Sequence, residues 1–315
     1  MRPRLPRALV MIAALLALAV VGLGAYVRLS DAGLGCPDWP GCYGQVSPHH
    51  AAGAIAAAQA EQPEGPVSTA KAWKEMVHRY LASLLGLVIL AIAGLAWRRE
   101  RGLDRGLALG LAGLVVFQGL LGMWTVTLGL RPAIVSAHLV GGMTTLALLV
   151  WLAARLGRSP DVGPEWPVGL ARLALLAVAM QIALGGWVSS HYAALACADF
   201  PTCGGAWWPD ADWRSAFRID GEAGLDALVA MHWAHRLGAV LVTLAVAALA
   251  WRLLREPGRG KPGWWLLGLL AGQLSLGALN ILAGLPLAVA VAHNLVAALL
   301  LASLVWLHAN SRRAT

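Results

Sequence analysis

Four histidines lie inside long apolar segments of this chain, and their type and spacing are the clearest indication of chemistry. An ionisable side chain within a membrane-spanning segment is costly, so it marks a functional site by default. Counted from the expected helix starts, each histidine lies about five or six residues into its helix. At 1.5 Å per residue this places all four roughly 7–9 Å below one membrane boundary. They are His78, His138, His235 and His293.

The four histidines form two pairs, one in each half of the chain. We expect each pair to lie on the second and fourth helices of a four-helix bundle, where facing helices commonly build a metal or cofactor site. Two imidazoles without a further ligand suit bis-axial ligation of a heme iron. A zinc site would need three or four ligands, and no Cys, Asp or Glu lies at this depth in both halves. A role limited to interhelical hydrogen bonds does not explain why the histidines recur in pairs.

Glu75 distinguishes the two halves. It lies three residues before His78, whereas the corresponding residue before His235 is His232. Residues three apart share a helix face, so Glu75 should point toward the same site as His78. A carboxylate there could accept a proton or stabilise a developing cation. The alternative is an acidic residue favoured by the dipole of the first helical turn. For His232, a spare ligand, a hydrogen-bonding group and a partner of a heme propionate all remain open.

Two arginines directly follow candidate ligands. Arg79 follows His78 and Arg236 follows His235. Their guanidinium groups would either pair with heme propionates near the outer surface or extend to the membrane interface. The other histidines have no counterpart in the opposite half and are expected at water-exposed ends: His49, His50, His191 and His308.

The elements that position these residues are membrane helices. Of the 315 residues, 59% are hydrophobic and only 13% charged, with a mean hydropathy of +0.67. Soluble domains average about 25% charged residues, and disordered chains have low hydrophobicity. The apolar runs show no barrel-like alternation, so the fold class is an all-α polytopic membrane protein. Eight runs approach the roughly 20 residues of a transmembrane helix: 8–29, 74–97, 106–128, 133–154, 169–190, 229–251, 264–284 and 287–308.

The basic residues predict the orientation. Sixteen of the 24 Lys and Arg residues fall in segments on one side, so the positive-inside rule places both termini in the cytoplasm of a cell-membrane protein. The net charge of +8 then reflects topology and gives no support to nucleic-acid binding. The first apolar run is expected to stay as an anchor rather than be cleaved. The predicted cytoplasmic segments are 1–7, 98–105, 155–172, 252–261 and 309–315.

The two halves match as a parallel repeat. The pattern C-x-D-aromatic-P-x-C occurs at 36–42 and again 161 residues later, and the His-Arg pair recurs after 157 residues. Gln118, Gly122 and His138 recur after 155 residues as Gln273, Gly277 and His293. We therefore predict two tandem four-helix bundles, 1–154 and 169–315, joined by a cytoplasmic linker at 155–168. Residues 49–70 are interpreted as a solvated insertion.

Each predicted outer loop, 30–73 and 191–228, carries two cysteines. An oxidising compartment and five intervening residues allow the disulfides Cys36–Cys42 and Cys197–Cys203. A redox relay to the heme site is the alternative. Since the spacing is not C-x-x-C, a structural bridge is favoured.

Several motifs together resemble the heme A synthase family over nearly the whole chain, apart from 49–70. They are GLGCPDWPGC at 33–42, Glu75-Met-Val-His78-Arg79, Gln118-Gly-Leu-Leu-Gly122, Ser136-Ala-His138-Leu, Met231-His-Trp-Ala-His235-Arg236 and Ala292-His293-Asn. The resemblance implies a membrane oxidoreductase that converts the C8 methyl of heme O to the formyl of heme A by successive hydroxylations, for cytochrome oxidase assembly.

The resemblance also implies roles for the site residues. The N-terminal half would hold the substrate heme O between His78 and His138, with Glu75 catalytic. The C-terminal half would hold a resident heme b between His235 and His293 for electron transfer. Arg79, Arg236 and His232 would contact the hemes. Such a protein is surrounded by membrane lipid. The resemblance leaves open whether a heme O synthase or an oxidase assembly factor docks on it, and whether it forms homo-oligomers.

Three other functions use part of the same pattern. A b-type electron-transfer cytochrome would need the four histidines but not Glu75. A membrane thiol oxidase would need the outer cysteines but not buried histidines. A transporter would explain the duplication but not the paired ligands.

Overall fold

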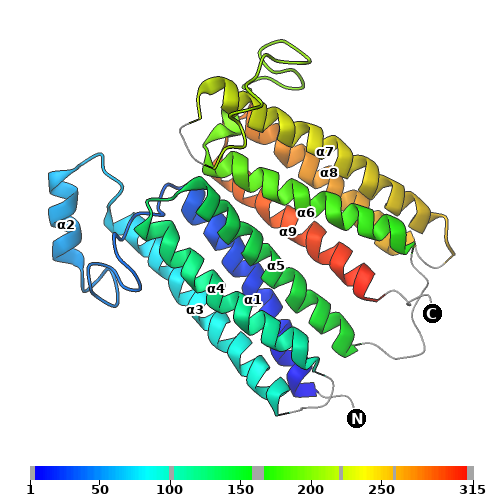
Figure 1. Cartoon of the computed structure of the whole chain (residues 1–315), viewed down its shortest axis with the longest axis horizontal. Coiled ribbons are helices and arrows are strands. Elements are labelled where there is room, and N and C mark those ends of the chain that lie inside the picture. Colours follow the sequence, from blue (N-terminus) through cyan, green and yellow to red (C-terminus); the bar gives the residue numbers. More distant parts are fainter. Residues whose placement is uncertain (1–3, 99–102, 158–166, 220–222, 258–259, 311–315) are drawn as a thin grey trace. The chain divides into compact units, whose positions relative to one another are not determined.

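The computed structural model describes residues 4–98, 103–157, 167–219, 223–257 and 260–310, and these residues form helices and no strand (Figure 1). Eight of these helices are long and apolar enough to cross a membrane, which confirms the predicted all-α, multi-pass fold. A short ninth α-helix, α2, lies outside the spans. The elements are α1 (Arg4–Leu29), α2 (Ala52–Glu61), α3 (Thr69–Trp97), α4 (Arg105–Thr127), α5 (Pro132–Gly157), α6 (Val168–Ser190), the 3₁₀ turn η1 (Ala193–Leu195), α7 (Leu225–Leu254), α8 (Gly260–Leu282) and α9 (Leu287–Ala309).

Four helices, α1, α3, α7 and α8, begin four or five residues earlier than hydropathy predicts, and two of them, α3 and α7, carry candidate ligands. The α3 helix starts at Thr69, where the Ser68 side chain accepts a hydrogen bond from the Lys71 N–H at 3.3 Å as an N-cap. The α7 helix starts at Leu225. His78 is therefore the tenth residue of its helix and His235 the eleventh, so the expected count of five or six residues was wrong for this pair.

The predicted solvated insertion contains a helix that hydropathy alone did not predict. Alanine dominates α2, and alanine has the highest helix propensity. Ile55 on α2 is completely buried against the first cysteine loop, whereas most other α2 residues are exposed. The insertion thus packs on the loop through Ile55, together with buried Ala51 and partly buried Val67. His49 and His50 just before α2 are exposed, as expected, while His191 and His308 are half-buried.

The chain divides into two compact units, Met1–Leu152 and Ala153–Thr315. Within the first unit, α3 packs on both α1 and α4. Within the second, α7 packs on α6 and α8, and α9 packs on α6 and α8. The boundary falls near the end of α5. Residues 158–166 of the expected linker lie outside the described residues.

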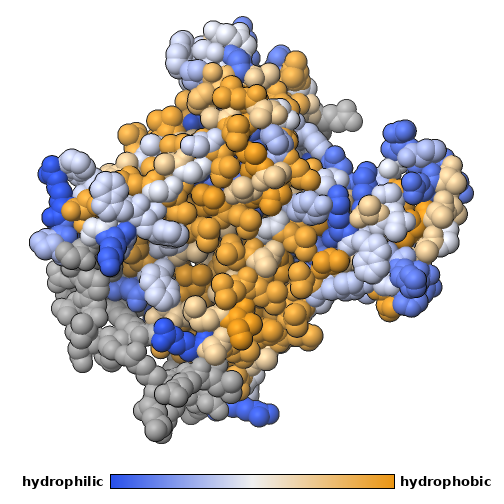
Figure 2. Space-filling view, turned by 180° about the vertical axis from the view of Figure 1, so that it is seen from behind, coloured by the Kyte–Doolittle hydropathy of each residue, from blue (hydrophilic) through white to orange (hydrophobic). Residues whose placement is uncertain are grey.

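Many large apolar side chains of the spans are exposed, and hydrophobic residues occupy much of the face shown in Figure 2. Leu87, Leu176 and Leu244, for example, are each more than 60% exposed. An apolar exterior of this extent suits lipid, where all backbone polar groups must be satisfied inside the helices. Orientation relative to the two sides of the membrane stays a prediction.

Candidate functional site

The structure brings the predicted histidine pairs together within each unit. His78 on α3 and His138 on α5 lie within electrostatic range of each other, and so do His235 on α7 and His293 on α9. All four residues are half-buried. Each unit therefore has two imidazoles near each other, carried by two different helices of the unit.

Each imidazole packs against a glycine of another helix in its unit. A Cβ added to Gly24 on α1 would lie 3.0 Å from Cε1 of His78, and one added to Gly122 on α4 would lie 3.5 Å from Cε1 of His138. In the second unit the same atoms are 3.1 Å apart for Gly185 on α6 and His235, and 3.2 Å apart for Gly277 on α8 and His293.

Sequence reasoning found two of these glycines, Gly122 and Gly277, and missed the other two. The signal was present, because Gly24 and Gly185 are 161 residues apart, the same spacing as the cysteine loops.

Glu75 and Arg79 hold the first cysteine loop onto α3. The Glu75 carboxylate, 4% exposed, accepts from the Cys36 backbone N–H through Oε2 at 2.9 Å and from Arg79 Nη2 through Oε1 at 2.5 Å. The Nη1 of Arg79 donates to the carbonyl oxygens of Asp38 at 2.9 Å, Pro40 at 3.3 Å and Gly41. One buried ion pair thus satisfies the backbone groups of a loop that has no regular structure.

His232 and Arg236 occupy the equivalent places in the second unit. The Cys197 N–H lies 3.2 Å from His232 Nδ1, and Arg236 Nε lies 3.3 Å from His232 Nε2. A neutral imidazole has one acceptor nitrogen, so His232 accepts one of these two hydrogen bonds at a time. Arg236 also donates to the carbonyl oxygens of Thr202 at 2.7 Å, and of Cys197 and Asp199, both at 2.9 Å.

Both guanidinium groups are thus directed at the cysteine loop of their own unit. Both donate to loop carbonyls, a role that the sequence did not predict.

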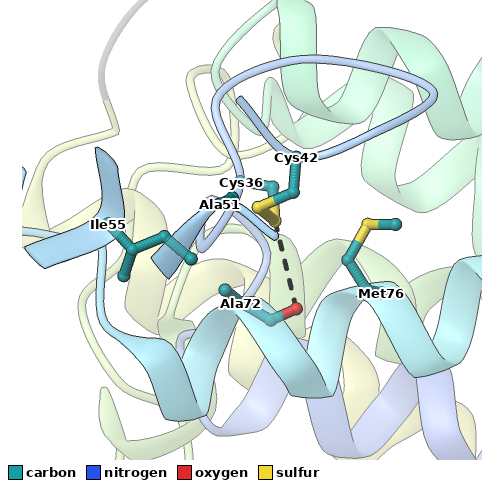
Figure 3. Close-up of a cluster of buried hydrophobic side chains, with 6 residues drawn as sticks. All are labelled: Cys36, Cys42, Ala51, Ile55, Ala72 and Met76. Atoms are coloured by element: carbon teal, nitrogen blue, oxygen red, sulfur yellow. Dashed lines mark hydrogen bonds between the residues drawn. A yellow bond between two sulfur atoms is a disulfide. The ribbon is translucent and has the colours of Figure 1, made fainter. Parts of the chain in front are cut away.

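Both cysteine loops are closed by a disulfide, Cys36–Cys42 and Cys197–Cys203. Figure 3 shows the first disulfide above α3, with Cys36 Sγ 4.0 Å from the Ala72 carbonyl and Ile55 and Met76 beside it. Both bridges are buried in small apolar clusters.

The aspartate of the repeated motif stabilises the turn that follows the second cysteine. Asp38 accepts from the N–H groups of Tyr43 and Gly44, both at 2.6 Å. Asp199 accepts from the Thr202 hydroxyl at 2.5 Å and from the N–H groups of Gly204 and Gly205. These hydrogen bonds, that of Thr202 first, lower the pKa of Asp199 to about 2.

Glutamine contacts differ between the units. In the second unit, Gln273 Nε2 lies 3.2 Å from His293 Nε2, and Gln181 Nε2 lies 3.0 Å from His235 Nδ1. In the first unit, the Gln118 amide lies instead against the bare backbone of Gly141, and its Nε2 has no hydrogen-bond partner among the described residues. Gln181 has no counterpart at the repeat spacing, so pattern matching could not have found it.

The histidine pairs fit a bis-axial heme. The buried Nδ1 atoms of His78, His138 and His293 have no hydrogen-bond partner among the residues that the structure describes. Each of these three rings thus keeps one nitrogen outside any hydrogen bond in the described part of the chain, whereas His235, and His293 through its Nε2, lie against a glutamine amide. Two imidazoles from two helices of one unit are the donor set that a six-coordinate heme iron takes.

Comparison with known proteins agrees with this chemistry. A family model described as cytochrome oxidase assembly protein matches residues 7–305. The chain is 42% identical to the heme A synthase of Shewanella oneidensis over 304 residues, which are 92% of each chain. It is 32% identical to the heme A synthase of Rhizorhabdus wittichii, over 94% of this chain and 91% of the relative. It is 35% identical to that of Methylobacterium nodulans, over 91% and 87% respectively.

Proposed function

Because this chain belongs to the cytochrome oxidase assembly protein family, we propose that it works as a heme A synthase, a membrane oxidoreductase that converts heme O to heme A. The observation that carries the proposal is the pair of imidazoles in each unit, each packed on a glycine of another helix. The reaction is inferred from family membership, and its site is inferred from the histidine pairs.

We assign the substrate to the first unit and a resident heme b to the second. His78 and His138 would ligate heme O, while His235 and His293 would ligate heme b, whose chemistry is one-electron transfer. Two features support this division. Three residues before the first histidine of the pair, the first unit has a carboxylate, Glu75, where the second unit has His232. In the second unit a glutamine amide contacts each imidazole, so the two histidine pairs differ in their surroundings.

Glu75 is our candidate for the catalytic carboxylate. It is one helical turn from His78 and therefore on the same side of α3. Its direction is fixed by Arg79 and by the backbone N–H groups of Cys36 and Gly35. A carboxylate fixed in apolar surroundings stabilises positive charge developing next to it, or accepts a proton from it. Oxidation of a methyl to a formyl group by successive hydroxylations requires such proton transfers.

The test is to express the chain in cells that lack heme A, with and without a source of heme O, and to identify the extracted hemes by mass. Heme A should accumulate only when both the chain and heme O are present. The His78→Ala variant should abolish it, and His49→Ala, at an exposed histidine, should not. Absence of heme A from the complete system would refute the proposal.

Pyridine hemochromogen spectra of the purified protein separate this function from the others. A heme A synthase should contain heme b together with heme O or heme A. A b-type electron-transfer cytochrome would contain heme b alone. A thiol oxidase or a transporter would contain none.

A further inference from the structure

All four candidate ligand histidines share one environment, a glycine on another helix of the same unit. The histidines occupy α3, α5, α7 and α9, and the glycines occupy α1, α4, α6 and α8. We propose that three of them, Gly24, Gly185 and Gly277, are positioning residues, whose bare backbone sets the place and plane of the imidazoles of His78, His235 and His293. This inference rests on the proposed ligation of heme by the four histidines.

Backbone conformation does not explain these glycines. All four lie within helices, and none has the positive φ that favours glycine. In a helix interior alanine is preferred over glycine, so local structure alone would select a methyl group at each place. The reason for its absence must lie in what the methyl group would touch.

The methyl group would touch the imidazole. Carbon atoms in ordinary van der Waals contact lie 3.4–4 Å apart, whereas added Cβ atoms at Gly24, Gly185 and Gly277 would lie 3.0, 3.1 and 3.2 Å from the ring. Each ring would have to move by a few tenths of an ångström. At Gly122 the distance of 3.5 Å already allows a methyl group. The expected displacement of the ring by an alanine therefore decreases in the order Gly24, Gly185, Gly277 and Gly122.

Packing has to orient these rings because hydrogen bonds do so only in part. The Nδ1 atoms of His78, His138 and His293 are buried without a hydrogen-bond partner among the described residues. Axial imidazoles are usually oriented by a hydrogen bond to the nitrogen that does not bind the metal. Where that bond is missing, contact with the neighbouring helix is what remains to fix the ring.

The experiment compares glycine-to-alanine variants of the purified, heme-loaded protein. Gly24→Ala, Gly185→Ala and Gly277→Ala are the test variants, and Gly122→Ala is the graded control. Gly119→Ala on α4 and Gly272→Ala on α8 are matched controls, since a Cβ at either meets nothing within 4 Å. Heme per chain is measured by pyridine hemochromogen, and ligand geometry by the g values of the low-spin ferric signal in electron paramagnetic resonance.

Each test variant should shift the g values of the heme in its own unit or lose at least half of that heme. The three control variants should keep both the content and the spectrum of the unmodified protein. Unchanged spectra and heme content in all three test variants would overturn the inference, as would equal losses in the controls. Failure of all three test variants to fold, with the controls folded, would also overturn it, since a positioning role leaves the fold intact.

The two proposals fail in different ways. Unmodified protein without any heme would refute the proposed function. Unmodified protein with two hemes, and test variants that match the controls, would refute only the role of the glycines.

Discussion

Removing Arg79 should open the first cysteine loop far more than removing Arg236 opens the second. In Arg79→Met, the Glu75 carboxylate loses its charged partner and keeps only the backbone N–H groups of Cys36 and Gly35, while its side chain stays about 5% exposed. Breaking a buried ion pair by deleting one partner costs about 3–5 kcal/mol, because the remaining charge is uncompensated. In Arg236→Met the remaining partner is His232, which can be neutral, so only hydrogen bonds of about 1–3 kcal/mol are lost.

The assay is the rate at which a reductant opens each disulfide in detergent-solubilised protein, followed by alkylation and mass analysis of the cysteines. When opening is fast relative to reduction, this rate reports the population of the open loop. Arg79→Met should raise the rate for Cys36–Cys42 by on the order of 10²–10³-fold. Arg236→Met should raise that for Cys197–Cys203 by about tenfold.

A double variant isolates the effect of the Glu75 charge that is left without a partner. Glu75→Met combined with Arg79→Met removes both charges, so its disulfide should be reduced more slowly than in Arg79→Met alone. Equal rates in these two variants, or equal effects of the two single arginine variants, would refute the reasoning.

Three further predictions concern the first-unit carboxylate and the loops. Glu75→Gln should keep heme content in purified protein while heme A output falls by about 10²-fold or more, and normal output would remove its catalytic assignment. Cys36→Ser should lower thermal stability and reduce heme A output only in part if the bridge is structural; complete loss of output at normal heme content would favour a redox relay. Asp199 has a depressed pKa, so its contribution to loop stability is present above about pH 4 and is lost as pH falls through about 2. A phosphine reductant should therefore open Cys197–Cys203 faster as pH falls through this window, and Asp199→Asn should flatten that dependence.

The spans, and the histidines that stand out within them, could be picked out because their signals are local. An apolar run of about 20 residues predicts a transmembrane helix wherever it occurs. A histidine within it, such as His138, is conspicuous by its cost. Helix starts were less accurate, since hydropathy does not register the polar turn between Thr69 and Glu75.

The contacts that build the site could not be predicted because they join distant parts of the chain. Arg79 meets the Asp38 carbonyl across 41 residues, and Gln181 meets His235 across 54. A single sequence does not show that residues so far apart along the chain are in contact. The packing of Ile55 on the cysteine loop was missed for the same reason, since its neighbours in sequence are those of a solvated helix.

The ion pair between Glu75 and Arg79 bears on how the chain enters the bilayer during synthesis. Partners four residues apart meet as soon as the backbone becomes helical, so α3 inserts with its guanidinium charge already compensated. In α7 the place of the carboxylate is taken by His232, and the negative charge that acts on Arg236 is Asp199, which belongs to the loop. Compensation of the Arg236 charge therefore requires the cysteine loop of the second unit to be folded, whereas compensation of the Arg79 charge requires α3 alone.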